Sequence, residues 1–418
     1  MFFFYQIFII LIIIFSPIIL IYRFFKNKEH LTRFTEKFCF ITKKRKQGNL
    51  IWIHSASVGE FMSVVPLIKE LEKSKKIKMI LVTTSTLSSS KVFKNFKFKK
   101  TIHQFFPIDF SGFTSRFINY WEPKMAIFID SEIWPCMYKN LNKKKIPLLL
   151  LNARLTERSY KRWSYFKEFS KTIFGCIDYA FPQNHETFEY LKKLDIKKIK
   201  NIGNLKFSNI KNENAEKFPK SFLLSIKNRS IFCASSTHPN EEILIGKAHI
   251  ALKKKFKNLL TVIIPRHINR ISEIQREMKV MGLESIIKSS KKHINDKTDI
   301  FLVDSYGETK KFFQVSKIAF IGGSFVNHGG QNPIEPARYN LDILHGPNVN
   351  NFKDIYNLFN KKKIAYKIKN LDQLIYYTKK LFNRNYNRKI DLKKIGNSVL
   401  KKSVSEIKDI LNHETKKT

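Results

Sequence analysis

Cysteine is scarce in this chain, and no two cysteines stand close together in the sequence. Only four occur among 418 residues. They are Cys39, Cys136, Cys176 and Cys233, with no C-x-x-C pair. A disulfide framework or a cysteine metal site would need closer and more regular spacing. We therefore predict reduced, structural thiols in a reducing compartment, and no metal bound by them.

Acidic residues are also few, 34 against 77 basic ones, which leaves a net charge of +43. Such an excess favours nucleic acid, an anionic membrane or an anionic lipid as partner, unless lysine is simply the default surface residue. The basic residues are spread along the whole chain. No RNA-recognition motif, helix-turn-helix signature or zinc finger supports nucleic acid. We therefore expect no nucleic-acid partner, and leave anionic lipid and solvated surface open.

The first 22 residues lack any charged side chain and are mostly Phe, Ile and Leu. At about 1.5 Å per residue they can cross a hydrocarbon core of about 30 Å. A cleaved signal peptide is disfavoured because no basic region precedes them and no small-residue cleavage site follows. Five basic residues come next: Arg23, Lys26, Lys28, Arg33 and Lys37. By the positive-inside rule, 1–25 is predicted to anchor a cytoplasmic body at the inner face of a membrane.

Beyond the anchor, the chain has what two folded α/β domains require. Hydrophobic residues make up 43% of it, and its length suffices for two cores. Strand-like apolar runs alternate with helical patterns, which predicts mostly parallel sheets covered on both faces. A Lys/Asn-rich segment, 209–230, interrupts the alternation and is predicted to link the domains. We place the domains at 26–208 and 209–418, the second ending in terminal helices, with a cleft between them.

Residues 51–66, IWIHSASVGEFMSVVP, pass from a strand through a loop of small residues into a helix. Ligands of open α/β sheets bind where strands end. Ser57 and Glu60 fit a capping box, and a helix N-terminus lowers the pKa of a carboxyl group and weakens it as a base. A closed, dry site would raise that pKa again, so that Glu60 could accept a proton. Capping and base catalysis both remain open for Glu60.

Three strand ends in the second domain carry groups suited to a nucleotide. Within NHGGQNPIEP, Asn332 is expected as N-cap, Pro333 as the first helical residue and Glu335 at the third position. The helix start would face a phosphate and Glu335 would bind a ribose hydroxyl, although plain capping fits equally well. Arg266, after Pro265, offers a planar fork for phosphate or a surface ion pair.

The third of these strand ends is Tyr306-Gly307-Glu308. Its backbone N–H groups could bind a base or a phosphate, and the alternative is a helix cap with Glu308 at the third helical position, N3. Each of the three segments is weak alone. Together they indicate a nucleotide site.

In the first domain, Asp130-Ser131-Glu132 also follows a strand. Paired carboxylates suggest a divalent metal that bridges a diphosphate, but no second acidic cluster lies nearby in the sequence, and a metal is therefore disfavoured. Lys206, in GNLK, could neutralise charge at the cleft or be a solvated lysine, and Arg154 is a similar case. The basic–aromatic segment 159–174 fits either an anionic membrane surface or a core-facing helix.

Several short motifs together resemble the 3-deoxy-D-manno-octulosonic acid (Kdo) transferases of lipid A biosynthesis. They occur in order and without large gaps, from the anchor to the C-terminal helices. They are SVGE at 57–60, SEIWP at 131–135, LNARLTERS at 151–159, GNLKF at 203–207, ASSTHPNEE at 234–242, PRH at 265–267, GE at 307–308 and GGSFVNHGGQNPIEPA at 322–337. The chain departs from the family's usual pattern at Ser131, commonly Thr, and at Thr309, often Leu or Met.

The resemblance implies a GT-B fold, with two Rossmann-like domains facing a cleft and an N-terminal membrane-anchor helix. It implies transfer of Kdo from CMP-Kdo to the lipid A precursor lipid IVA, by an inverting direct displacement. Glu60 would be the general base, and Glu132 and Lys206 would act in the transition state. The resemblance favours no metal or other cofactor, since CMP carries one phosphate only. Anionic inner-membrane lipid is the further expected partner.

By the same resemblance, the second domain holds CMP. The implied residues are Pro265, Arg266, Tyr306, Gly307, Glu308, Asn332, Pro333, Ile334 and Glu335. Two rival interpretations remain. One is a GT-B transferase that uses another nucleotide sugar on a lipid-linked acceptor. The other is a non-catalytic basic protein that binds membrane.

Overall fold

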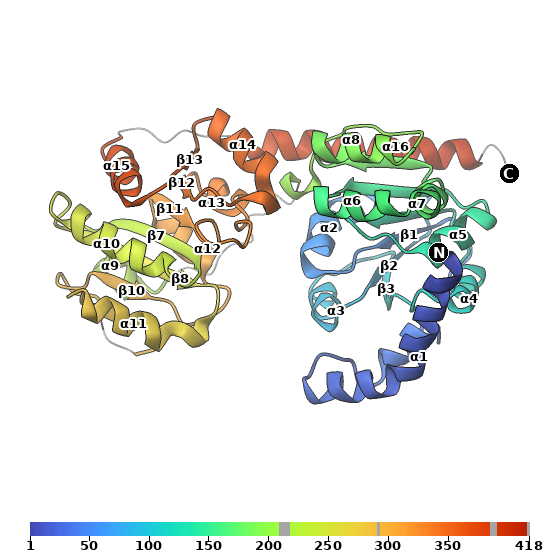
Figure 1. The fold of residues 1–418 in the computed structure, drawn as a ribbon, viewed down its shortest axis with the longest axis horizontal. Helices are drawn as coiled ribbons and strands as arrows, with labels where there is room; N and C mark the ends of the chain where they lie inside the picture. Colours follow the sequence, from blue (N-terminus) through green and yellow to red (C-terminus); the bar gives the residue numbers. More distant parts are fainter. Residues whose placement is uncertain (209–217, 291–292, 385–390, 416–418) are drawn as a thin grey trace. The chain divides into compact units, whose positions relative to one another are not determined.

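The computed structural model describes residues 1–208, 218–290, 293–384 and 391–415. The chain divides into two compact units (Figure 1). The first unit is Met1–Ile210 together with Lys393–Thr418, and the second is Lys211–Leu392. Part of the predicted linker, 209–217, lies outside the described residues. Its later part contains a helix, α9 (Lys220–Ser225).

The first unit has a six-stranded parallel sheet in the order β3-β2-β1-β4-β5-β6. Its strands are β1 (Leu50–His54), β2 (Met79–Thr84), β3 (Thr101–Phe105), β4 (Met125–Ile129), β5 (Leu148–Ala153) and β6 (Tyr179–Pro182). Its helices are α1 (Phe2–Phe25), α2 (Val58–Glu72), α3 (Leu87–Lys94), α4 (Ser111–Trp121), α5 (Pro135–Lys143), α6 (Glu157–Tyr165), α7 (Lys167–Phe174), α8 (His185–Lys193) and α16 (Leu392–Thr415). The strand order reverses at β1, which is where ligands bind in such sheets.

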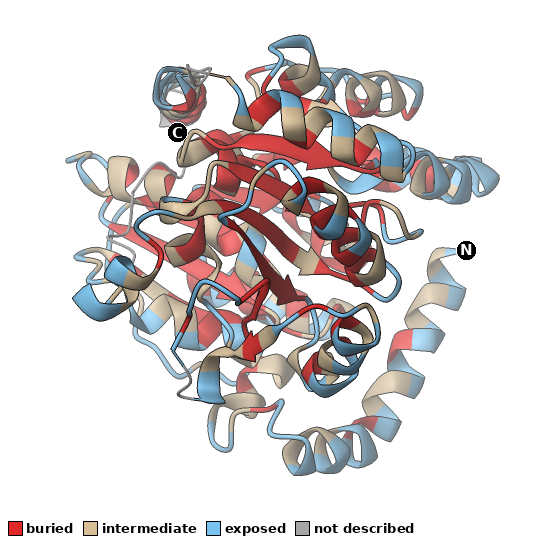
Figure 2. Cartoon of the chain, turned by 90° about the vertical axis from the view of Figure 1, so that its left-hand side faces the viewer, coloured by how far each residue is buried: buried red, intermediate tan, exposed pale blue. Residues whose placement is uncertain are grey.

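The strands of this sheet are apolar almost throughout because helices cover both of its faces. Successive β1 side chains alternate between two cores. Leu50 and Trp52 join one cluster, while Ile51 and Ile53 join the other. The strands are buried and the surrounding helices are exposed on their outer faces (Figure 2). The predicted alternation of strands and helices is therefore confirmed.

Helix α16, drawn in red in Figure 1, packs on the first unit. Val399, Ile407, Ile410 and Leu411 belong to the same core cluster as Ile51 and Ile53. The sequence prediction that the C-terminal helices all belong to the second domain is therefore wrong for α16. Its apolar residues recur at helical spacing, which predicts a buried face but does not identify the surface that buries it.

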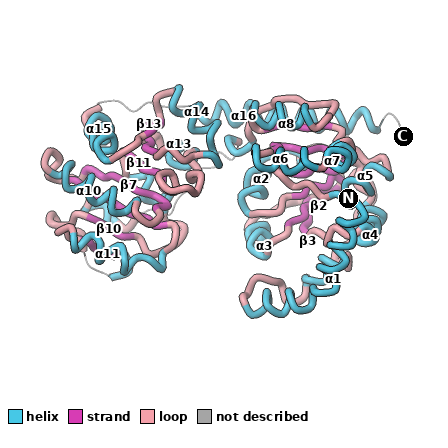
Figure 3. The backbone as a smooth tube through the Cα atoms, viewed as in Figure 1, coloured by secondary structure: helices cyan, strands magenta, loops and turns pink. Residues whose placement is uncertain are grey.

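The second unit has a seven-stranded parallel sheet in the order β13-β12-β11-β7-β8-β10-β9, with helices around it (Figure 3). Its strands are β7 (Ser230–Thr237), β8 (Leu259–Pro265), β9 (Ser285–Ile287), β10 (Ile300–Leu302), β11 (Ile318–Ile321), β12 (Asp342–His345) and β13 (Ala365–Lys367). Its helices besides α9 are α10 (Glu241–Lys253), α11 (Ile271–Val280), α12 (Thr309–Val315), α13 (Ile334–Arg338), α14 (Lys353–Lys361) and α15 (Leu371–Phe382). Short 3-10 turns occur at Arg33–Phe38, Leu205–Phe207, Ile268–Arg270, Lys288–Ser290 and Asn350–Phe352.

All four cysteines are buried free thiols, as predicted. Burial raises the pKa of Cys136 and of Cys233 to about 12 each, so both remain protonated at neutral pH. Within the described residues, no group of three or more His, Cys, Asp or Glu is arranged to hold a metal ion.

Helix α1 is the one helix of the described residues that is long and apolar enough to cross a membrane, with a mean hydropathy of 2.7. The first turns of α1 pack against the α/β part of the first unit. The Tyr5 hydroxyl donates to Asp109 Oδ2 at 2.7 Å, and the Lys139 ammonium lies 3.8 Å from the centre of the Phe2 ring. Asp109 also accepts the backbone N–H groups of Cys136 and Met137, at the start of α5. Burial raises the pKa of Asp109 to about 6.

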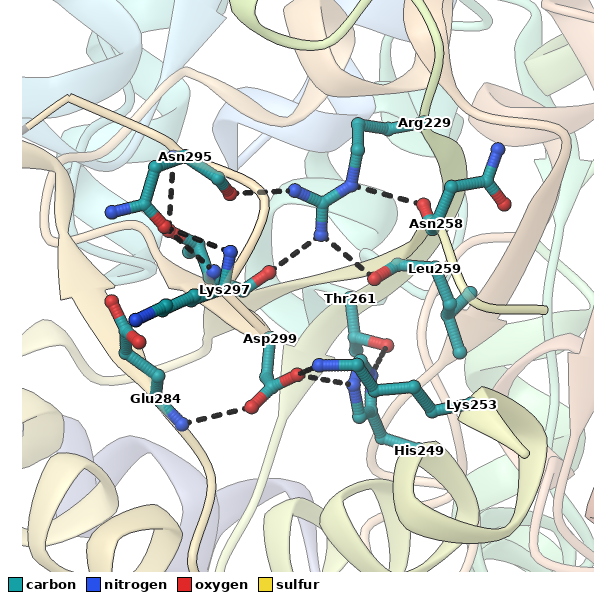
Figure 4. Close-up of polar contacts among 11 residues, drawn as sticks. Arg229, His249, Lys253, Asn258, Leu259, Thr261, Glu284, Asn295, Lys297 and Asp299 are labelled. Carbon is teal, nitrogen blue, oxygen red and sulfur yellow. Dashed lines mark hydrogen bonds and ion pairs between the residues drawn. The ribbon is translucent and has the colours of Figure 1, made fainter.

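Arg229 joins three segments of the second unit just before β7 (Figure 4). Its guanidinium donates to four backbone carbonyls, those of Asn258, Leu259, Asn295 and Thr298, at 2.5–2.9 Å. Next to this contact, Asp299 binds His249, Lys253 and the backbone N–H of Glu284. Burial opposes ionisation of Asp299, but these donors hold its pKa well below the usual range.

Replacing Arg229 by Lys is expected to destabilise the second unit by about 3 kcal/mol, because one ammonium cannot serve four carbonyls in the plane of a guanidinium. The measurement is the thermal unfolding midpoint. Arg276→Lys, at an exposed arginine of α11, is the matched control and should leave the midpoint unchanged. Equal midpoints for the two variants would refute the structural role of Arg229.

Candidate active site

Glu60 lies in the first turn of α2, directly after the carboxyl end of β1. Ser57 is the N-cap, and its Oγ accepts the Glu60 N–H at 3.3 Å. The Glu60 carboxylate accepts the Ser57 hydroxyl at 2.7 Å and the Ala56 N–H at 2.8 Å. The capping interaction is therefore present, and it holds the carboxylate at the carboxyl edge of the sheet.

The environment of Glu60 nevertheless favours its protonated form. Burial is the largest effect and, with the nearby charges of Glu132 and Asp130, it raises the pKa of Glu60 to about 7. The hydrogen bonds from Ser57 and Ala56 act in the opposite direction and are outweighed. A carboxyl group with such a pKa can accept a proton efficiently near neutral pH, so capping does not weaken Glu60 as a base.

Glu132, shortly after β4, is oriented by two donors. Its Oε2 accepts the Trp134 Nε1–H at 2.9 Å and lies 3.2 Å from His54 Nε2. The other ring nitrogen of His54 contacts Thr83 Oγ1 at 2.9 Å. That hydroxyl already accepts Trp52 Nε1–H, so its own proton is available to His54 Nδ1. This network assigns the Nε2–H tautomer to His54 and makes His54 a donor to Glu132.

Replacing His54 by Phe is expected to lower kcat up to about 100-fold, because Glu132 loses one of the two donors that orient it. The phenyl ring preserves the packing on Phe106, whose ring centre lies 3.9 Å from that of His54. His54→Gln restores an N–H and should recover part of kcat. Both kinetic constants and the thermal midpoint should be measured. A loss of kcat that simply follows a loss of stability in both variants would contradict a positioning role.

Lys206 and Asp130 form the remaining part of this site. Lys206 Nζ lies 3.7 Å from Asp130 Oδ2. Burial raises the pKa of Asp130, against the opposing charges of Lys206 and Arg154. Asn152, at the end of β5, accepts the Leu205 N–H at 2.9 Å and so orients the turn that carries Lys206. The structure thus brings Lys206 next to the residues that follow β4.

The second unit contains a carboxylate that no sequence argument singled out. Glu241 is buried at the start of α10 and accepts four backbone N–H groups. They belong to His238, Gly323, Ser324 and Phe325, at 2.8–3.0 Å. Glu241 therefore joins the loop after β11 to the loop after β7. The only sequence signal was its position within the motif ASSTHPNEE.

The predicted nucleotide residues lie at the carboxyl ends of β8, β10 and β11. Pro265 ends β8, in register with Thr237 of β7. Arg266 is exposed, and its backbone N–H donates to Thr237 O at 2.9 Å. Its guanidinium has no hydrogen bond or ion pair within the described part of the chain. That leaves it available to an anionic ligand.

The segment after β10 makes more side-chain contacts within the protein than Arg266 does. Tyr306 is 71% exposed, and Gly307 has a positive φ of 85°. Glu308 is paired with Lys288 at 3.2 Å and with Lys311 at 3.4 Å. Helix α12 begins at Thr309 and Glu308 is its N-cap, so the predicted N3 position of Glu308 is wrong. The loop backbone and the exposed ring are therefore the parts of this segment that a ligand can reach.

The predicted helix start at Asn332 is wrong by one residue. Helix α13 begins at Ile334, so Pro333 precedes it and Glu335 is its second residue. The Asn332 side chain still accepts the Ile334 N–H at 3.0 Å. Gly329 and Gly330, in the loop before the helix, both have positive φ, which glycine adopts without strain. At five residues, α13 has little dipole of its own.

The fold has solved counterparts. A UDP-GlcNAc 2-epimerase from Neisseria meningitidis bound to UDP-GlcNAc matches with a TM-score of 0.60, 12% identity and coverage of 88% of this chain and 100% of that one. A glycosyltransferase from Rickettsia africae matches with a TM-score of 0.58, 12% identity and coverage of 89% and 100%. Two parallel α/β units of this kind, with polar groups where their strands end, define a protein of the GT-B class.

The sequence comparisons identify the family within this class. Residues 32–209 match the family model described as 3-deoxy-D-manno-octulosonic-acid transferase. The transferase of that name from Rickettsia prowazekii is 36% identical over 338 residues, 81% of this chain and 73% of the relative. The one from Haemophilus influenzae is 34% identical over 311 residues, 74% and 73%. The chain belongs to the Kdo transferase family, and is thus a glycosyltransferase of lipid A biosynthesis, as the resemblance implied.

Proposed function

We propose that this transferase moves Kdo from CMP-Kdo to lipid IVA, at the cytoplasmic face of the inner membrane, by an inverting direct displacement. The observation that carries this proposal is Glu60. Its carboxyl group lies at the carboxyl edge of β1, has a pKa near 7 and is coupled electrostatically to Glu132. A general base of this strength is what a sugar hydroxyl requires in order to attack at neutral pH.

In the proposed reaction, an acceptor hydroxyl attacks the anomeric carbon of the donor. The new C–O bond forms as the bond to the phosphate oxygen breaks, CMP leaves, and the hydroxyl proton passes to Glu60. Lys206 supplies positive charge in the transition state. Glu132, held by His54 and Trp134, completes the site. Groups held in place in advance stabilise developing charge without reorganising during the reaction.

We propose that the second unit binds the CMP part of the donor without a metal. Arg266 would pair with the single phosphate, and Tyr306-Gly307-Glu308 and 332–335 would bind the rest of the nucleotide. The free guanidinium of Arg266 and the exposed Tyr306 support this assignment. One phosphate carries less charge than a diphosphate, so a cationic side chain and loop N–H groups can neutralise it.

The proposed membrane attachment rests on α1, whose exposed side chains are almost entirely apolar. In the structure the Tyr5 hydroxyl of α1 donates to Asp109. This hydrogen bond has to break if α1 is to cross the bilayer. Helices α6 and α7 add a basic surface with an exposed aromatic pair, and Tyr165 at the end of α6 is 82% exposed. No residue of α6 is fully buried, although Tyr160 and Trp163 pack against the core of the first unit and α7 buries Ile173 and Phe174 in it. This surface suits the anionic lipid that we propose as partner.

The test is to incubate detergent-solubilised protein with CMP-Kdo and tetraacylated lipid A precursor in EDTA, and to follow the lipid by mass spectrometry. We expect the mass of the lipid to rise in steps of one Kdo. Activity that appears only with added magnesium would refute the metal-free part and implicate Asp130 and Glu132. Because a structural counterpart binds UDP-GlcNAc, CMP and UDP should also be compared as inhibitors. Stronger inhibition by UDP would refute CMP-Kdo as donor.

A further inference from the structure

The neighbouring strands β4 and β5 of the first unit each have a buried residue of positive φ at the carboxyl end. The φ of Asp130, directly after β4, is 61°, and that of Asn152, near the end of β5, is 54°. The two residues are only 8% and 1% exposed. Asp and Asn adopt this conformation more readily than other residues with a side chain, yet it still costs free energy. Residues held in this way cluster at functional sites, which draws attention to both.

Hydrogen bonds join the two strand ends to each other and to the 3-10 turn that contains the candidate catalytic lysine. The Asp130 backbone donates to Leu151 O and accepts the Arg154 N–H, both at 3.1 Å. The backbone of Asp130 is therefore held on either side of Asn152. Asn152 Oδ1 in turn accepts the Leu205 N–H at 2.9 Å. The two strand ends and the turn thus form one hydrogen-bonded unit.

Within this unit, the Asp130 carboxylate meets the side chain of Lys206. Lys206 Nζ lies 3.7 Å from Asp130 Oδ2, and the two side chains are 21% and 10% exposed. A lysine side chain is long and flexible, so a partner at its tip restricts where the ammonium lies. Salt screens such a partly buried pair much less than a pair at the surface. Asn152 therefore fixes the turn, and Asp130 fixes the ammonium at the end of the side chain.

The charged groups that face Asp130 come from its own loop and from three other segments. Burial raises the pKa of Asp130, and the charge of Glu132 adds to this effect. The cations Lys206 and Arg154 act in the opposite direction. Glu60 of α2 is the fourth neighbour, because the charge of Asp130 contributes to its raised pKa. Two cations beside the carboxylate stabilise its negative charge, which is the form that can hold an ammonium.

We propose that Asp130 is a positioning residue of this transferase, whose carboxylate holds the Lys206 ammonium in place for the reaction. The inference rests on the proposed function, which gives Lys206 its role of supplying charge in the transition state. A charge that is held in advance stabilises the transition state without reorganising during the reaction. In this proposal Asp130 exchanges no proton and contacts no reacting atom, so it acts only through Lys206.

The test compares two aspartates that share a positive φ. Asp130→Asn removes the charge but keeps the shape and the tolerance of this conformation. Asp195→Asn is the matched control, because Asp195 lies in the same unit with a φ of 67° and is exposed. We expect Asp130→Asn to lower kcat by about 10- to 100-fold, with a KM for CMP-Kdo within about threefold of wild type, and Asp195→Asn to change neither. A kcat of Asp130→Asn within about twofold of wild type would overturn the proposal.

A double variant separates positioning from support of the fold. If Asp130 acts only through Lys206, adding Asp130→Asn to Lys206→Met should lower kcat by less than a further factor of about two. The assays are made well below the lowest unfolding midpoint, so that each variant is folded. Losses that multiply in the double variant would show that Asp130 acts independently of Lys206, and the positioning role would then be wrong.

The pH profile of Asp130→Asn gives a readout that a merely structural role would not move. Removing a negative neighbour favours the ionised form of Glu60, so the fall of kcat/KM on the acid side should move to lower pH. An unchanged profile would mean that Asp130 carries no charge in the site, and it would overturn the proposal.

All these assays contain EDTA, which distinguishes the possible failures. Failure of the wild-type protein to transfer Kdo under any condition would overturn the proposed function and this inference with it. Transfer that requires added magnesium would make Asp130 a metal ligand instead of a partner of Lys206. Normal transfer in EDTA by both the wild type and Asp130→Asn would overturn this inference alone.

Discussion

Replacing Glu60 by Gln is expected to lower the rate of Kdo transfer by about 10³-fold, the usual contribution of a general base. Gln has nearly the same shape and can still accept one of the hydrogen bonds from Ala56 and Ser57. The helix start should therefore persist, and only the capacity to take a proton is lost. The measurement is the initial rate at saturating CMP-Kdo and acceptor.

Glu70→Gln is the matched control for this experiment. Glu70 lies on the same helix, α2, in an exposed pair with Lys73, and its loss should leave the rate unchanged. The thermal midpoint of Glu60→Gln should not fall. The raised pKa means that the folded state disfavours the ionised Glu60, and a neutral amide removes that cost above pH 7. A rate within about tenfold of wild type would place the base elsewhere, with Glu132 as the first alternative.

The wild-type pH profile provides an independent reading of the same group. With a pKa of about 7, Glu60 is mostly protonated below neutrality and cannot act as a base. We therefore expect kcat/KM to fall as the pH decreases through 7, by roughly tenfold per unit once well below it. A profile that is flat from pH 5 to 8 would show that a carboxyl group with an ordinary pKa, or none, is the base.

Replacing Glu241 by Gln is expected to destabilise the second unit by about 4 kcal/mol. Each carboxylate oxygen accepts two backbone N–H groups, and the amide nitrogen of Gln can accept none. Two buried N–H groups would thus face another donor. For a unit of this size we expect the unfolding midpoint to fall by about 10 °C.

Glu241→Gln should also weaken CMP binding, since Gly323, Ser324 and Phe325 lose their common acceptor and the loop that leads from β11 to the proposed CMP-binding residues 332–335 is released. Glu273→Gln, at an exposed carboxylate of α11, is the control. It should change neither the midpoint nor the affinity for CMP. A normal midpoint together with normal CMP binding in Glu241→Gln would show that the four contacts contribute little.

The sequence predicted the α/β organisation because buried parallel strands must be apolar on both faces. Runs such as 125–129 and 148–151 are therefore recognisable without any knowledge of their partners. The candidate site residues were predicted for a related reason. In such sheets the groups that meet a ligand stand directly after strands, which is where Glu60, Glu132 and Arg266 occur.

Other features depend on contacts between distant segments, and no local pattern specifies those. From the sequence, His54 is predicted only as one more residue of a buried strand. Its contact with Glu132, 78 positions later, forms only in the folded protein. From the sequence, Glu241 is predicted only as a residue in the first turn of a helix. Its role as acceptor for the N–H groups of residues 323–325 appears only in the folded protein. Gly329 and Gly330 both have positive φ, a conformation that glycine permits but that its presence in the sequence does not specify.

By itself, the amino-acid sequence determined the fold class, the apolar N-terminal helix, the family and the strand ends that carry the candidate site residues. These follow from local pattern, composition and motif, each of which a single segment contains. Only the tertiary structure decided that α16 packs on the first unit, that Glu60 combines a cap with a pKa near 7, and that Glu241 accepts four backbone N–H groups from two loops. Burial and charge at one atom are sums over neighbours from many segments, and those neighbours exist only once the chain has folded.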